Sequence, residues 1–103
     1  MRKTIVETGK YQYAQSAATA LLMEHNKVSM GDANDRAYSA ILRVNQLWHA
    51  ANGGRSREAC SMEITNKDSS IVIVTQQGYA GDNAWKVEYD DGKPEKGGDA
   101  NGS

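Results

Sequence analysis

The sequence predicts an α+β domain in which an N-terminal antiparallel helical hairpin is followed by a three-stranded antiparallel β meander. Three observations support this prediction. From Lys10 to about residue 51, apolar residues recur at spacings of three and four, the period of an amphipathic helix. After Arg55, apolar and polar residues alternate, as in a half-buried strand. From Asp91 onward the chain is polar, so we expect residues 1–90 to form a single domain and residues 91–103 a disordered tail.

The first helix is expected from Lys10 to about Val28. One stripe of a 3.6-residue period is formed by Tyr11, Ala14, Ala18, Leu21, Leu22, His25 and Val28. The stretch from Ser29 to Asp32 interrupts this stripe. Either of these two end residues can accept hydrogen bonds from the first turn of the next helix.

The second helix is expected from Ala33 to Ala51. Its buried stripe consists of Ala37, Ile41, Val44, Trp48 and Ala51, with Ala40 and Leu47 beside it. Asn52-Gly53-Gly54 ends the helix, because Asn and Gly tolerate the left-handed conformation of a helix C-cap. Two helices joined by about four residues pack most easily as an antiparallel pair.

Three later segments are typical of strands. In Ser61–Thr65 and Trp85–Asp90 every second residue is apolar, which predicts strands buried on one face. Ile71–Val74 is β-branched throughout, as expected of a central strand covered on both faces or lying at an interface. Residues 4–6 are expected to add a fourth strand.

The composition predicts a thin core. The chain has five isoleucines, four leucines, six valines and no phenylalanine. Together these four residue types make up 15 of the 103 residues, which is below the roughly 20% under which disorder becomes a concern. A formal net charge of −1 argues against disorder, and two Trp, five Tyr and thirteen Ala supply further apolar surface. We therefore expect a folded domain that gains stability from a partner or from self-association.

Catalysis and metal binding find little support. Cys60 with His25 or His49 is the one set that resembles a nucleophile and a base, and a small enzyme ranks third among the functions considered. The same residues lack the short spacing of zinc ligands, so no metal and no cofactor are expected. The alternative is a purely structural role, in which Cys60 packs as a small apolar residue at the start of a strand.

The alternative function is association with nucleic acid through arginines around the second helix. Arg36 and Arg43 are seven residues apart and share a helical face, and Arg55 and Arg57 continue beyond the helix end. The near-neutral net charge argues against this, because phosphate binding needs cations concentrated on one surface.

The leading interpretation is a non-enzymatic protein-binding module that acts as an inhibitor or adaptor of a larger protein. The contact residues we expect are Tyr79 and Tyr13 with Arg55 and Arg57, because Tyr and Arg dominate interface hot spots. An edge strand can add a partner's strand, and an aliphatic central strand can support a homodimer.

The compartment expected for the chain is the cytoplasm. A single cysteine permits no intrachain disulfide, and no signal peptide or membrane span is apparent in the sequence. Small inhibitors and adaptors of bacteria and phages have this build, including some that disarm host defences, which is an analogy of size and fold class. For a phage protein the compartment would be the host cytoplasm.

Overall fold

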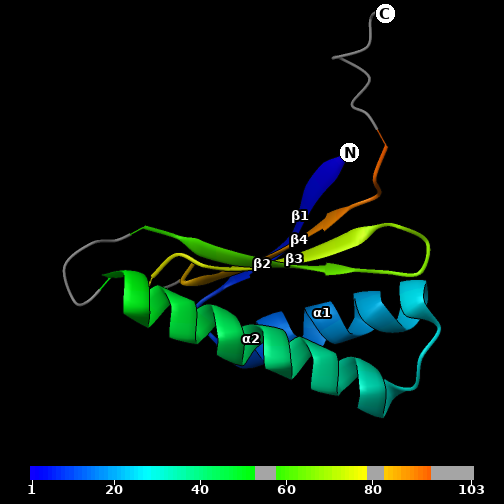
Figure 1. Cartoon of the computed structure of the whole chain (residues 1–103), viewed down its shortest axis with the longest axis horizontal. Helices are drawn as coiled ribbons and strands as arrows, with labels where there is room; N and C mark the ends of the chain where they lie inside the picture. Colours follow the sequence, from blue (N-terminus) through cyan, green and yellow to red (C-terminus); the bar gives the residue numbers. More distant parts are fainter. Residues whose placement is uncertain (53–57, 79–82, 94–103) are drawn as a thin grey trace, which may run out of the picture.

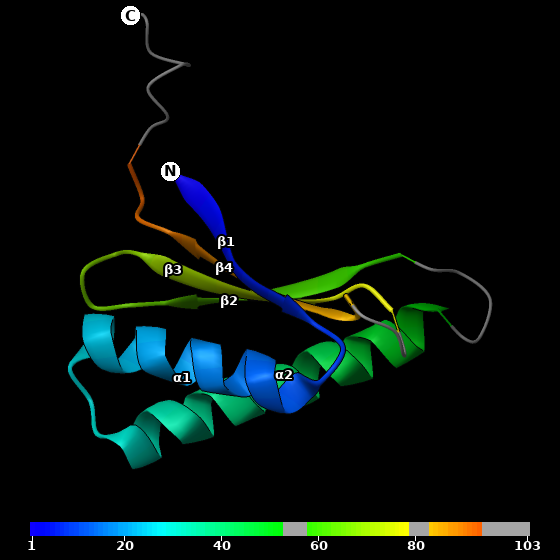
Figure 2. The same ribbon diagram turned by 180° about the vertical axis from the view of Figure 1, so that it is seen from behind.

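A computed structural model of the chain describes residues 1–52, 58–78 and 83–93. The elements in chain order are β1 (Arg2–Thr8), α1 (Tyr11–Asn26), α2 (Met30–Asn52), β2 (Cys60–Thr65), β3 (Ile71–Gln76) and β4 (Trp85–Asp90). The strands form one antiparallel sheet in the order β1-β4-β3-β2, and both helices lie against the same face of it (Figures 1 and 2). The predicted α+β fold is confirmed, including the helical hairpin, the meander and the fourth strand.

The turn between the helices explains where α1 ends and where α2 begins. Lys27 adopts the left-handed conformation with φ of 58°, and its N–H donates to the carbonyl of Met23 at 3.2 Å. Ser29 Oγ then accepts a hydrogen bond from the N–H of Asp32 at 3.2 Å, so Ser29 caps α2. The second helix therefore begins at Met30, three residues earlier than predicted. Gly53 and Gly54, the predicted stop signal, lie outside the described residues, as does most of the predicted disordered tail.

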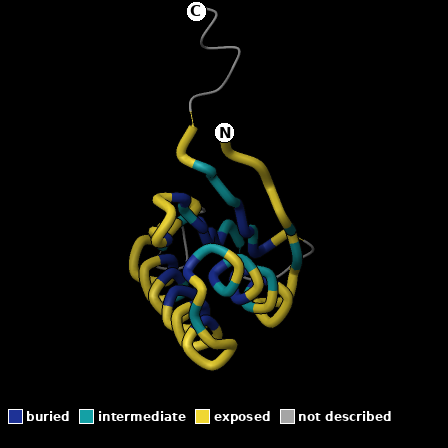
Figure 3. The backbone as a smooth tube through the Cα atoms, turned by 90° about the vertical axis from the view of Figure 1, so that its right-hand side faces the viewer, coloured by how far each residue is buried: buried dark blue, intermediate teal, exposed yellow. Residues whose placement is uncertain are grey.

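Alanine builds much of the core. The central apolar cluster contains Ala14, Ala18, Leu22, Ala33, Ala37, Ala40, Ile41, Val44, Val72, Val74, Ala84, Trp85 and Val87. Such small side chains let the helix backbones lie close to each other and to the sheet, so a chain poor in large aliphatic residues still fills its interior. Figure 3 shows the buried residues on the inner sides of the helices and the exposed ones on their outer turns.

Three residues assigned to the buried helical stripes are exposed. Tyr11 stands at the first residue of α1, where no preceding turn covers it, and Ala51 lies close to the end of α2. Leu47 lies beside the stripe and is also exposed. The predictions were wrong here because helical periodicity alone does not locate the ends and edges of a contact.

The register of the paired strands shows which residues point to the same face of the sheet. Val72 of β3 stands opposite Ile64 of β2 and Tyr89 of β4, and all three pack in or against the core beneath the helices. Ile73 faces the other way, opposite Glu63 and Glu88, yet only 3% of its surface is exposed. The all-β-branched segment thus forms β3, one of the two inner strands of the sheet, and both of its faces are largely covered.

Glu88 departs from the predicted one-sided burial of β4. It is a charged residue on the sheet face away from the helices, yet it is only 8% exposed. Arg2 of β1 reaches it with two hydrogen bonds, from Nε to Oε2 at 3.0 Å and from Nη2 to Oε1 at 2.7 Å. These bonds from Arg2 lower the pKa of the Glu88 carboxyl. The prediction that only the apolar face of this strand is buried was wrong for Glu88, because the alternating pattern does not show that β1 pairs with β4.

Candidate functional site

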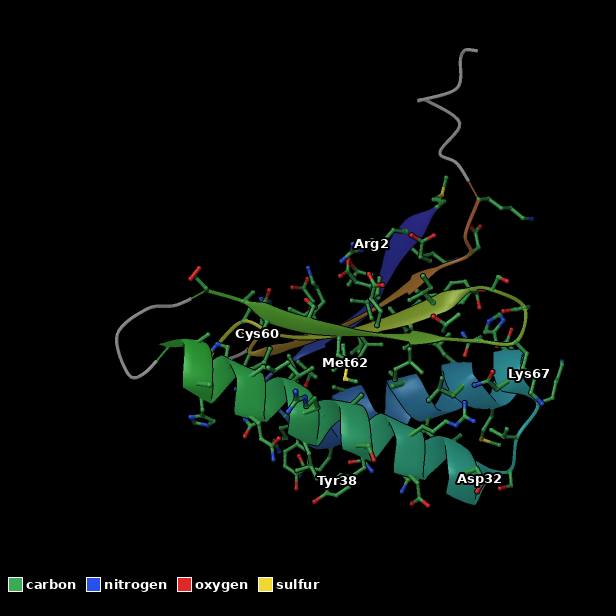
Figure 4. The ribbon with its side chains drawn as sticks, viewed as in Figure 1. Arg2, Asp32, Tyr38, Cys60, Met62 and Lys67 are labelled. Carbon is green, nitrogen blue, oxygen red and sulfur yellow. The ribbon has the colours of Figure 1, made fainter. Side chains whose placement is uncertain are left out.

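A hollow of about 290 Å³ opens at the boundary between the helical layer and the sheet. Its walls come from α1, α2 and β4, and its lining residues are Tyr11, Tyr38, Ile41, Leu42, Asn45 and Trp85. We call this feature the tyrosine hollow. Figure 4 shows Tyr38 on the outer side of α2.

The spacing of residues on α2 explains the rim of the tyrosine hollow. Tyr38 and Leu42 are four residues apart, so they lie on one face of the helix, each one position after a buried residue of the core stripe, Ala37 or Ile41. They are 44% and 45% exposed, and Tyr11 of α1 is 42% exposed. Three large side chains with apolar surface are therefore accessible at the same hollow.

The inner wall of the hollow is fixed by buried groups. Trp85, the first residue of β4, is only 6% exposed. Asn45 donates from Nδ2 to Oε1 of the buried Gln76 at 2.9 Å, which holds the amide in one orientation. None of the residues that line the hollow carries a formal charge. The site offers aromatic and aliphatic surface with tyrosine hydroxyls at its rim, which suits an apolar side chain of a partner.

The predicted contact residues do not come together at the tyrosine hollow. Tyr13 is 59% exposed on α1 but is not part of the lining, and Lys10 Nζ lies 5.9 Å from the centre of its ring. Tyr79, Arg55 and Arg57 lie outside the described residues. The sequence offered one signal for the actual rim, the pair Tyr38 and Leu42 spaced by four beside the buried stripe.

A second depression, which we call the β2 groove, runs between α2 and β2 and has a volume of about 650 Å³. Arg36 and Arg43, predicted to share a helical face, both line it. Asp35 and Glu63 line it as well, so the two positive side chains of the groove are matched by two negative ones. This balance provides no concentration of positive charge for a phosphate backbone.

The residues proposed for catalysis or metal binding are placed apart. His25, at the end of α1, stacks on Tyr89 with ring centres 4.6 Å apart, and its Nδ1 lies 2.8 Å from Oδ2 of Asp68. Cys60 is at the opposite end of β2 from the β2–β3 turn that carries Asp68, and His49 contacts Trp48 edge-on. Within residues 1–52, 58–78 and 83–93, no three His, Cys, Asp or Glu side chains group as metal ligands.

The hydrogen bonds that the Asp68 carboxylate accepts from Ser70 and His25 make the stability of the fold depend on pH. Hydrogen bonds from Ser70, whose Oγ lies 2.5 Å from Oδ1 of Asp68, and from His25 lower the pKa of Asp68 from 3.8 to about 2. A carboxyl group with a depressed pKa stabilises the fold above its unfolded pKa, and this contribution is lost as the pH falls from about 4 to about 2.

We expect the free energy of unfolding to fall more steeply in this interval for the unmodified chain than for Asp68→Asn. Urea denaturation at a series of pH values from 5 to 2 gives the free energy of unfolding of each protein as a function of pH. The two curves should differ in slope mainly between about pH 4 and pH 2, where Asp68 takes up its proton. Glu88 and Asp91 also have lowered pKa values and contribute equally to both proteins, so the difference reports Asp68. Identical slopes would contradict the role assigned to this turn.

Comparison of the chain with protein-family models, with curated proteins and with solved structures finds no match. In the part of the chain that the structure describes, neither helix has the length and apolar character needed to cross a bilayer.

Proposed function

We propose that this chain is a non-enzymatic protein-binding module, an inhibitor or adaptor that receives a large apolar side chain of its partner in the tyrosine hollow. The observation that carries the proposal is the gathering of Tyr11, Tyr38 and Leu42 around one hollow, each more than 40% exposed. Single exposed apolar residues are ordinary, whereas several around one hollow are typical of an interaction site.

The form of the hollow favours a protein over a small molecule as the partner. Small-molecule pockets enclose most of their ligand, and their apolar lining is largely withdrawn from solvent. Here the two tyrosines and Leu42 remain exposed around a small recess, an arrangement that suits an anchor residue surrounded by a flatter contact. Tyrosine supplies a rigid apolar ring and a hydroxyl, so it adds contact area at a low entropy cost.

Leu42→Glu tests the proposal, with Met30→Glu as its matched control. Both residues are exposed and apolar on α2, but Met30 is not part of the tyrosine hollow. A partner captured by the unmodified chain after nuclease treatment should be retained by Met30→Glu. We expect Leu42→Glu to weaken its binding by at least about 30-fold, as for a central anchor contact worth roughly 2 kcal/mol.

Equal binding by the two variants would exclude the tyrosine hollow as the contact site. Capture that disappears on nuclease treatment would instead favour the nucleic-acid alternative and direct attention to Arg36 and Arg43 in the β2 groove. Circular dichroism of each variant separates loss of binding from loss of fold.

A further inference from the structure

The two edges of the sheet differ in their protection against pairing with another strand. On β1 the register with β4 shifts between Thr4 and Val6, which marks a bulge, and three of its seven residues, Arg2, Lys3 and Glu7, are charged. On β2 the register with β3 is regular over all six residues, and Glu63 is the one charged residue. Bulges and edge charges prevent edge-to-edge association, so β1 is a protected edge and β2 is not.

The side chains next to the β2 edge provide apolar surface for an added strand. Met62 and Ile64 face the helical layer, where they line the β2 groove together with Ala40. Met62 is 37% exposed, and Figure 4 shows it projecting from the strand toward α2. In the described chain, β2 has a neighbouring strand on one side only, so its other side presents unpaired backbone groups.

The charges of the β2 groove indicate what kind of strand would fit. Arg36 and Arg43 are balanced by Asp35 and Glu63, so the surface attracts neither a strongly acidic nor a strongly basic segment. A surface with both signs can match a second copy of itself across a two-fold axis. We propose that β2 pairs antiparallel with β2 of a second copy, which joins two four-stranded sheets into one continuous sheet.

The register of this pair follows from the two faces of the strand. Residues directly opposite each other in an antiparallel pair point to the same face of the sheet. When both helical layers lie on the same side of the joined sheet, the two-fold axis therefore passes between the two copies of one residue, which stand opposite each other. An axis at Glu63 would set two carboxylates opposite each other, which is unfavourable. An axis at Met62 sets the two methionines together and places Cys60 opposite Ile64 and Ser61 opposite Glu63.

The axis at Met62 therefore buries apolar side chains on the helical side without opposing like charges. Met62, Ile64 and Cys60 of both copies would form one row beneath the two α2 helices. On the other face, the Ser61 hydroxyl can donate to the opposite Glu63 carboxylate. This dimer is independent of the tyrosine hollow, which has no β2 residue in its lining.

Replacement of Met62 by lysine tests the interface, with Ile5→Lys as the matched control. Both residues are exposed and apolar on edge strands, at 37% and 40%, but Ile5 lies at the bulge of the protected edge. Sedimentation equilibrium should give the unmodified chain and Ile5→Lys twice the mass of one chain. Met62→Lys places two ammonium groups opposite each other at the axis. We expect it to raise the dissociation constant of the dimer at least ten-fold.

A single-chain mass for the unmodified protein at every concentration would overturn the proposal. Dissociation caused by Ile5→Lys, or an unchanged dimer in Met62→Lys, would place the interface elsewhere and would also overturn it. Circular dichroism confirms that each variant is folded.

A cysteine at the axis tests the register and does not depend on the lysine variant. Directly opposite residues of an antiparallel pair have Cα atoms about 4.5–5.5 Å apart, within the range of a disulfide. Met62→Cys in a Cys60→Ser background should therefore form an interchain disulfide under mild oxidation by a glutathione mixture. Cys60 of the unmodified chain should not, because Ile64 stands opposite it. Efficient cross-linking through Cys60 itself, or none through Met62→Cys, would overturn the register.

Discussion

Replacement of Trp48 by alanine is expected to lower the free energy of unfolding by about 3–5 kcal/mol, the usual cost of truncating a large buried aromatic residue. Trp48 is only 3% exposed although it lies near the end of α2. Removing the indole of a residue this deeply buried leaves a cavity, which adds to the lost burial of apolar surface. Small domains have about 5–15 kcal/mol of stability, so this variant should lose a large fraction of it.

Urea denaturation followed by far-ultraviolet circular dichroism measures this loss, since a fluorescence signal would change with the removed indole. Leu47→Ala is the matched control, because Leu47 precedes Trp48 on the same helix but is 37% exposed. Its cost should be clearly smaller. A cost below about 1 kcal/mol for Trp48→Ala would show that the indole does not support the core.

Replacement of Ala37 by leucine should destabilise the domain by about 1–3 kcal/mol, although leucine is the more hydrophobic residue. Ala37 has no exposed surface, and it belongs to a cluster that draws side chains from both helices and the sheet. The added atoms have no space unless α2 moves away from its neighbours. The short distance between backbones that alanine permits is therefore a requirement of this core.

Ala50→Leu is the control for this overpacking, because Ala50 is an exposed residue of the same helix. Its effect on the free energy of unfolding should remain within about 0.5 kcal/mol, as for most surface substitutions. Stabilisation by Ala37→Leu, measured by the same urea titration, would mean that the interior contains unfilled space.

Periodicity predicted the elements of this fold well because each pattern reflects local geometry. The change of period after the second helix located the meander, and the β-branched Ile71–Val74 correctly indicated an inner strand of the sheet. What periodicity could not supply was pairing between distant segments. The position of β1 beside β4, and with it the burial of Glu88 under Arg2, depends on a contact that no local pattern encodes.

The tyrosine hollow was missed for a related reason. Its lining comes from α1, α2 and β4, so it exists only when three separate elements meet. Residue type and expected exposure favoured Tyr13 and Tyr79 as contact residues. Helical periodicity instead placed Tyr11 in the core, and Tyr38 was not among the predicted contact residues. Two large residues spaced by four just outside a buried stripe, such as Tyr38 and Leu42, are the signal that would have located the rim.

The pairing of β1 with β4 also sets the order of events during synthesis. Arg2 and Glu88 are 86 residues apart in the chain, and β1 has no other strand neighbour in the described sheet. The first strand therefore leaves the ribosome long before its partner exists, and closing so long a loop slows folding relative to local contacts. Because Trp85 of β4 completes the tyrosine hollow, the proposed contact site can form only after translation has passed the last strand.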